Sequence, residues 1–136
     1  MSSYKAEYIR YMQENGIKYR DIDEVAVGVT YDADNLNSVD VIVIFDKDGK
    51  NYVSLNSWSI GSFTDETFAK GIITCNEMNA QYRWCKFFLN GDKKVTVQID
   101  TVVQPDTCGE VLAELVRRVV HISDEAYPSF MKARWA

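Results

Sequence analysis

The sequence has very little histidine and lacks the motifs that are typical of catalytic and metal sites. His121 is the only histidine among 136 residues, which excludes a multi-histidine metal site and leaves one group for acid–base chemistry near neutral pH. Its apolar neighbours predict a helix position with an exposed or locally bonded imidazole. There is no glycine-rich phosphate loop, nucleophile elbow or recognisable carboxylate pair. The sequence therefore favours a non-enzymatic protein with no metal and no cofactor.

Cysteines are also few, and their number argues against a disulfide framework. The three cysteines are an odd number, and in a chain that we expect to be cytoplasmic they should be free thiols. Cys75 and Cys85 share apolar faces with their neighbours and are expected to be small buried side chains. Cys108 stands at a predicted helix start, a position that lowers a thiol's pKa. It is the one candidate for a reactive thiol.

Long apolar runs and an excess of basic residues are both missing. No segment approaches the roughly 20 apolar residues that cross a bilayer, and the start MSSYKAEYIRYMQENG lacks the charge pattern and apolar stretch of a signal peptide. The net charge of −5 opposes duplex binding, which needs clustered lysine and arginine. We therefore expect a soluble, cytoplasmic protein that binds neither nucleic acid nor membrane.

The chain does contain enough apolar residues for one core. Hydrophobic residues make up 46% and aromatic residues 12% of the sequence, which is more than disordered chains carry. A chain of 136 residues is usual for one domain, and no linker or repeat divides it. We expect a single domain over residues 1–136.

The first half predicts one helix followed by an antiparallel meander. Aromatic residues at helical spacing, with Gly16 after them, predict a helix over residues 3–15. The turn Asp48-Gly49 is typical of a hairpin. Three strand-like runs follow the helix, at residues 24–31, 39–45 and 51–60.

The second half predicts the order helix, two strands, helix. Helical spacing over residues 65–82 changes to alternation from Trp84, and a returning strand follows over residues 95–103. Thr107-Cys-Gly-Glu110 is a capping box for the next helix, and we expect Ser123 to cap a short last one. The whole predicts an α+β fold of order helix-β-β-β-helix-β-β-helix, in which helices pack on a five-stranded antiparallel sheet.

One predicted strand, VDVIVIF at residues 39–45, is apolar on both faces. Val41 and Val43 point one way and Ile42 and Ile44 the other. If the helices gather on one face, a partner subunit or a ligand is needed to cover the second. The alternative is a sheet covered by helices on both faces, with aromatic residues at its rims.

A sequence pattern in the second half resembles a known family. It contains Asn76-x-x-Asn79, Phe87-Phe88-Leu89, a turn, the strand at 95–103, and a helix with Val111-Leu112 and Val119-Val120. This pattern resembles the YbjN-type family of bacterial sensory transduction regulators, which have a type III secretion chaperone-like fold. The resemblance implies the helix and strand order given above, a homodimer, and binding or regulation in place of catalysis. From the residues themselves, we expect the two asparagines to satisfy backbone groups at a helix end.

Two classes of function follow. The first is a non-enzymatic protein-binding module, chaperone-like or regulatory, which buries a protein client or partner with its apolar sheet face and the helix at 65–82. The candidate contact residues are aromatic: Tyr4, Tyr8, Tyr11, Trp58, Trp84 and Phe88. The alternative is a small-molecule-binding or thiol-based sensor, with Cys108 or His121 at a pocket between sheet and helices.

Overall fold

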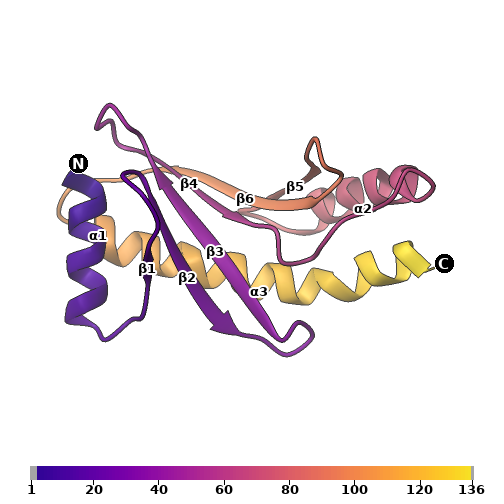
Figure 1. Ribbon diagram of the computed structural model, residues 1–136, viewed down its shortest axis with the longest axis horizontal. Coiled ribbons are helices and arrows are strands. Elements are labelled where there is room, and N and C mark those ends of the chain that lie inside the picture. Colours follow the sequence, from indigo (N-terminus) through magenta and orange to yellow (C-terminus); the bar gives the residue numbers. More distant parts are fainter. Residues whose placement is uncertain (1–2, 136) are drawn as a thin grey trace.

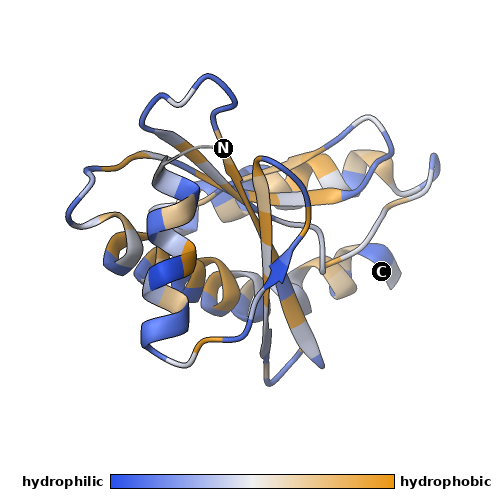
Figure 2. Cartoon of the chain, turned by 60° about the vertical axis from the view of Figure 1, so that its left-hand side comes forward, coloured by the Kyte–Doolittle hydropathy of each residue, from blue (hydrophilic) through white to orange (hydrophobic). Residues whose placement is uncertain are grey.

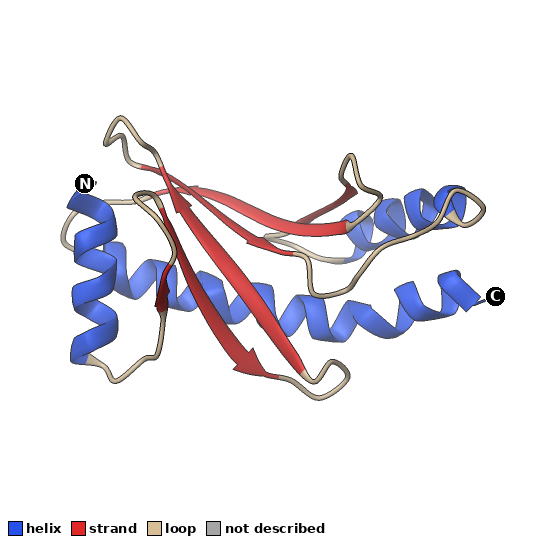
Figure 3. Cartoon of the chain, in the orientation of Figure 1, coloured by secondary structure: helices blue, strands red, loops and turns tan. Residues whose placement is uncertain are grey.

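The computed structural model describes residues 3–135 and has the predicted α+β order (Figure 3). Its elements are α1 (Ser3–Glu14), β1 (Arg20–Asp21), β2 (Ala26–Asp32), β3 (Ser38–Phe45), β4 (Tyr52–Ser57), α2 (Phe68–Gln81), β5 (Lys86–Leu89), β6 (Val95–Val102) and α3 (Cys108–Trp135). The strands form one antiparallel sheet in the order β1-β2-β3-β4-β6-β5. The fold class is confirmed, and β1 adds a short sixth strand to the five predicted.

The three helices gather on one face of the sheet. α3 runs along that face. α1 crosses the N-terminal end of α3, and α2 lies beside β5 and the C-terminal half of α3 (Figure 1). Alternate side chains of the strands are fully buried under α3, as strand geometry dictates; on β3 they are Val39, Val41, Val43 and Phe45. The matching stripe on α3 is Leu112, Leu115, Val116, Val119, Ile122, Ala126 and Phe130. Burial of these two apolar surfaces is the main stabilising contribution.

α1 approaches α3 very closely at Gly109. A Cβ atom at this position would lie 2.3 Å from the Cβ of Tyr11, so only glycine permits this distance. On its other side, α1 holds β1 in place. The buried Lys5 donates to the Asp21 carboxylate at 2.6 Å and to the backbone carbonyl of Asp23. β1 has only two residues. Such a strand is too short to show the alternation of apolar and polar residues by which strands are predicted from sequence.

The prediction that Ser123 caps a separate last helix is wrong. α3 is one helix of 28 residues, in which Ser123 is buried and Pro128 lies in the interior. Proline has no N–H, so the carbonyl of Asp124, four residues earlier, loses its helical donor. The side-chain amide of Asn35 donates to this carbonyl at 3.1 Å. The loop between β2 and β3 thus replaces the hydrogen bond that Pro128 removes.

The Asp124 carboxylate binds the same loop in return. It accepts the backbone N–H groups of Leu36 at 2.7 Å, Asn35 at 2.8 Å and Asp34 at 3.2 Å. Burial acts to raise the pKa of this carboxyl, but the three hydrogen bonds and the nearby His121 outweigh it and lower the pKa. We call this set of contacts between the β2–β3 loop and α3 the Asp124 clamp.

Helix length and composition also bear on membrane insertion. Among residues 3–135, no helix combines the length and the apolar content that a bilayer span requires. A cytoplasmic location stays a prediction.

Asp124→Ala is expected to lower the free energy of unfolding by about 1–2 kcal/mol, because three backbone N–H groups lose a charged acceptor. Urea denaturation at neutral pH measures this. Since the folded-state pKa is lowered, the contribution is present above about pH 4, the ordinary Asp range, and disappears as the pH falls through the folded-state value. The difference between wild type and variant should therefore shrink in acid.

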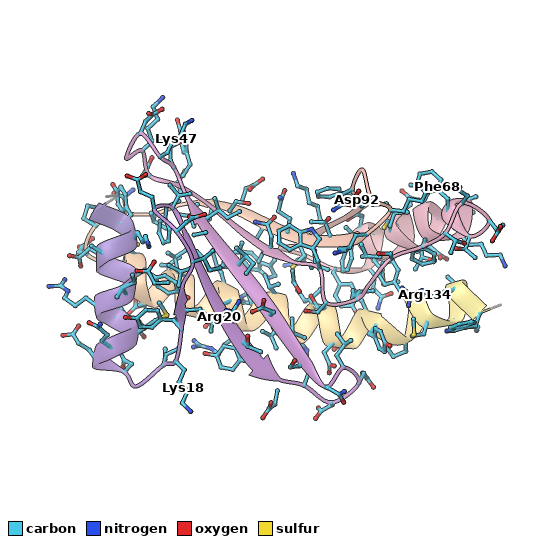
Figure 4. The ribbon with its side chains drawn as sticks, in the orientation of Figure 1. Lys18, Arg20, Lys47, Phe68, Asp92 and Arg134 are labelled. Carbon is cyan, nitrogen blue, oxygen red and sulfur yellow. The ribbon has the colours of Figure 1, made fainter. Side chains whose placement is uncertain are left out.

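Asp92→Ala is the control, because this exposed carboxylate lies on the turn between β5 and β6 (Figure 4). Its effect should stay within about 0.5 kcal/mol. An Asp124→Ala variant as stable as this control at neutral pH would contradict the clamp.

Candidate interaction surfaces

In the described part of the chain, the sheet face opposite α3 carries no helix. One register line crosses all six strands on this face: Arg20, Gly28, Ile42, Asn56, Gln98 and Lys86. Its centre is polar, since the side-chain amide of Gln98 donates to the Asn56 side-chain oxygen at 2.6 Å. The expected second apolar face therefore holds for β3, where Ile42 and Ile44 are half-buried, but not for the neighbouring Asn56 of β4 and Gln98 of β6.

Arg20 covers one end of this open face. From β1 it reaches over Gly28, where a Cβ would lie 2.3 Å from the guanidinium. It donates to the Thr30 hydroxyl at 2.9 Å and the Asp40 carboxylate at 3.0 Å. The β1 end of the face is thus closed by a network within the chain.

A shallow groove of about 470 Å³ lies near the β3–β4 hairpin. Tyr52 on β4 and Val102 on β6 stand directly opposite each other and are 54% and 61% exposed. Ile44 of β3, Asp46 and Asp100 also line it. We call this the sheet groove.

α2 is a second surface with exposed apolar side chains, since it packs on one side only. Its buried residues are Gly71, Thr74, Cys75 and Met78. The opposite side presents Ala69, Ile73, Asn76 and Ala80 at intervals of four, three and four residues, and Ile73 is 60% exposed. Phe68 (Figure 4) is exposed beside this row, and so is Ile72. We call this row and its two neighbours the outer face of α2; exposed clusters of this kind mark interaction sites.

The six aromatic candidates do not form one patch. Tyr8 is 1% exposed and its ring centroid lies 6.1 Å from that of Phe45, so it belongs to the core and cannot meet a partner. Tyr4 of α1 is half-buried against the start of α3, and its backbone carbonyl lies 3.6 Å from the Cys108 sulfur. Two candidates therefore lie in or against the helical side.

Trp58 and Phe88 lie on the open sheet face, on either side of Thr96. The Trp58 indole N–H donates to the Thr96 hydroxyl at 3.0 Å, and Phe88 stands opposite Thr96 in the β5–β6 register. The half-buried Trp58 and the more exposed Phe88 thus extend the open face beyond the sheet groove.

Trp84 is held out from the surface by a strained turn. Its φ is +77°, a costly value for a bulky residue, and the N–H of Cys85 donates to the Arg83 carbonyl across it at 2.9 Å. The indole lies 4.7 Å from the Arg118 guanidinium, a cation–π contact with α3. With Tyr11 it lines a cavity on the helical side of the molecule.

Asn79 satisfies backbone groups, as predicted, but these belong to β5 and not to the end of α2. Its side-chain amide donates to the Phe87 carbonyl at 3.0 Å, and its oxygen accepts the Phe87 N–H at 2.7 Å. Because β5 is an edge strand, this contact blocks strand addition at Phe87. Asn76 lies exposed on the outer face of α2.

All three cysteines are free and buried. Burial raises the pKa of Cys75 and Cys108 to about 11 and that of Cys85 to about 12. For Cys108 the nearby Glu7 acts in the same direction. The helix start therefore does not activate Cys108.

His121 is exposed on α3 and lies 3.0 Å from the Glu125 carboxylate, which also accepts the Tyr82 hydroxyl. It lines a cavity of about 230 Å³ with Tyr31 and Asp124, and no cysteine lines that cavity. Within residues 3–135, no three His, Cys, Asp or Glu side chains come together as a metal site. His121 thus lines a pocket between β2 and α3, where the sequence alternative places one, whereas Cys108 takes no part in it.

At neutral pH we expect iodoacetamide to alkylate the three native thiols at least roughly 100-fold more slowly than an ordinary exposed thiol, because thiolate is scarce at these pKa values. Mass spectrometry over time measures this. All three should react once urea unfolds the chain. Ser129→Cys, on an exposed position of α3, is the fast control. Rapid native labelling of Cys108 would contradict the burial.

The fold and these surfaces can now be set beside known proteins. A family model described as "YbjN: Putative bacterial sensory transduction regulator" matches residues 10–132. The crystal structure of YbjN, described as "a putative transcription regulator from E. coli", superposes with a TM-score of 0.61, at 12% identity and over 87% of each chain. That likeness shows the fold. No curated protein sequence matches this chain. Because the family model spans nearly the whole chain, the protein belongs to the YbjN family.

Proposed function

We propose that this chain is a non-enzymatic regulatory protein that acts by binding other proteins, as a homodimer. The observation that carries the proposal is the clustering of exposed hydrophobic side chains. Tyr52 and Val102 gather at the sheet groove, and Phe68, Ile72 and Ile73 gather on α2. Hydrophobic residues follow the central strands and α2 in Figure 2. Two separate apolar surfaces suit a protein that binds a second copy and a partner together.

The family description supports the regulatory part of the proposal. The E. coli structure is described as a putative transcription regulator, but the present chain carries a net charge of −5. An acidic protein is repelled by nucleic-acid phosphates. We therefore assign regulation to contacts with proteins.

The outer face of α2 suits a second copy of the same helix. Ala69 and Ala80 are small and flank Ile73, so two such helices can approach closely. A twofold axis near Ile73 makes the contact self-complementary, as in most homodimers. In the antiparallel arrangement Glu77 of one copy lies near Lys70 of the other. Charge as well as shape favours this pairing.

The thiol-based or small-molecule alternative has weaker support. The three thiols are buried and their pKa values are raised. The sheet groove lies on the outside of the sheet, away from the helices. Its shallow, open form suits a segment of a protein better than an enclosed small molecule.

Ile73→Glu is expected to dissociate the dimer, because the twofold axis brings two carboxylates together in an apolar contact. Light scattering after size exclusion at tens of micromolar should give a dimer for the wild type. The variant's dissociation constant should rise by at least about tenfold. A wild-type monomer under these conditions would overturn the homodimer.

Ile22→Glu is the matched control, since Ile22 is 46% exposed and lies outside α2. This variant should remain dimeric. Circular dichroism of both variants checks that the fold is kept. A control that dissociates as readily as Ile73→Glu would place the contact elsewhere.

A further inference from the structure

The floor of the sheet groove includes three apolar side chains, Ile44, Tyr52 and Val102. Tyr52 and Val102 form a directly opposed cross-strand pair, and Ile44 lies diagonally beside Tyr52 because its register partner is Ser54. Side chains in these positions contact a common neighbour above the sheet. The three together make an apolar patch at the β3–β4 hairpin end of the open face.

The rim of the groove is acidic. Asp46 accepts the backbone N–H groups of Asp48 and Lys50, both at 3.1 Å, so the hairpin turn holds its carboxylate in place. Asp100 lies on β6, and its carboxylate is 3.5 Å from the Lys86 ammonium. Both of these side chains are more than half exposed, and such a pair contributes little. An incoming cation can replace Lys86 at small cost.

The lysines of the hairpin do not neutralise this rim. Neither Lys47 nor Lys50 lines the groove, and Lys47 projects from the hairpin away from the helices (Figure 4). Asp46 therefore faces the groove without a lysine of its own hairpin loop in the lining.

The position of the groove also excludes strand addition. β4 lies between β3 and β6 in the sheet, so its backbone groups are already paired on both sides. A segment that binds here must be recognised through its side chains, unlike a strand added to an edge.

From this floor, rim and position we infer that the sheet groove binds an extended protein segment in which one large apolar side chain is flanked by lysine or arginine. The inference rests on the proposed protein-binding function and names the partner's chemistry. The apolar side chain covers Tyr52 and Val102, and the flanking cations lie beside Asp46 and Asp100. The protein's overall negative charge further favours a basic partner.

Three short synthetic peptides test this, each blocked at both ends and each with glycine flanks. Their central residues are Lys-Leu-Lys, Glu-Leu-Glu and Lys-Gly-Lys. Each is titrated into the ¹⁵N-labelled full-length protein, and amide chemical shifts are followed. Lys-Leu-Lys should shift the amides around Tyr52, Asp100 and Val102 and bind at least about tenfold more tightly than the other two.

Variants separate the two parts of the site. Tyr52→Ser should weaken Lys-Leu-Lys binding by about tenfold through loss of the apolar floor. Asp100→Asn should weaken it by about threefold, and added salt should then have a smaller effect than in the wild type. Asp92→Ala, on the exposed turn between β5 and β6, should leave peptide binding unchanged.

Any one of three results overturns the inference. If Glu-Leu-Glu binds as tightly as Lys-Leu-Lys, the acidic rim does not contribute to recognition. If Lys-Gly-Lys binds as tightly, the apolar floor does not contribute. If the chemical shifts change only at other surfaces, the groove is not the binding site. If the peptides fail while Ile73→Glu still dissociates the dimer, the inference fails and the proposed dimer stands. If the wild type is also monomeric, the dimer proposed above fails with it.

Discussion

The structure depends on one uninterrupted helix that crosses the whole sheet. α3 buries an apolar stripe against β3, β4 and β6, receives α1 at Gly109, and lies against α2 in its C-terminal half. A proline inside such a helix would ordinarily kink or end it. Here the Asn35 amide takes the place of the missing donor, and the Asp124 carboxylate holds the loop that carries Asn35. A hairpin loop thereby keeps the central helix continuous.

The position of α3 determines which surfaces remain for function. Because the three helices lie on one face, the polar groups of the opposite face form hydrogen bonds with one another and not with a helix. The Asn56–Gln98 pair and the Arg20 network do this at its centre and at the β1 end. Apolar side chains stay exposed at the hairpin corner and on α2, where packing with the rest of the chain covers one side only. These are the surfaces that the proposed regulatory role uses.

Local periodicity was sufficient to predict most of the fold and the family. The change from helical spacing to alternation at Trp84 located the corner between α2 and β5, and the burial of Cys75 and Cys85 followed from their positions on apolar faces. The element order and the Asn76-x-x-Asn79 pattern led to the family that the comparison then showed. These features depend on neighbours in sequence, so the sequence carries them.

The failures all depend on contacts between distant residues. Ser123 resembles a helix cap, but α3 continues through it. The side-chain amide of Asn35, 89 positions from Asp124 in the sequence, donates to the Asp124 carbonyl that Pro128 leaves without a helical donor. Tyr8 shares the aromatic stripe of α1 with Tyr4 and Tyr11, and only its contact with Phe45 identifies it as a core residue in place of a candidate contact residue. β1 pairs with β2 and is held on its other side by the contact of Lys5 with Asp21. The sheet groove was missed because register alone places Tyr52 opposite Val102, and no local pattern sets that register.

Hydrogen–deuterium exchange at two protein concentrations tests the central claim, that α2 binds a second copy while the open sheet face stays free for a partner. Raising the concentration through the dimer transition should slow amide exchange within residues 68–81 of α2. Exchange in β4 and β6 should not change. Slowed exchange in β4 and β6, or exchange independent of concentration throughout the chain, would contradict the account.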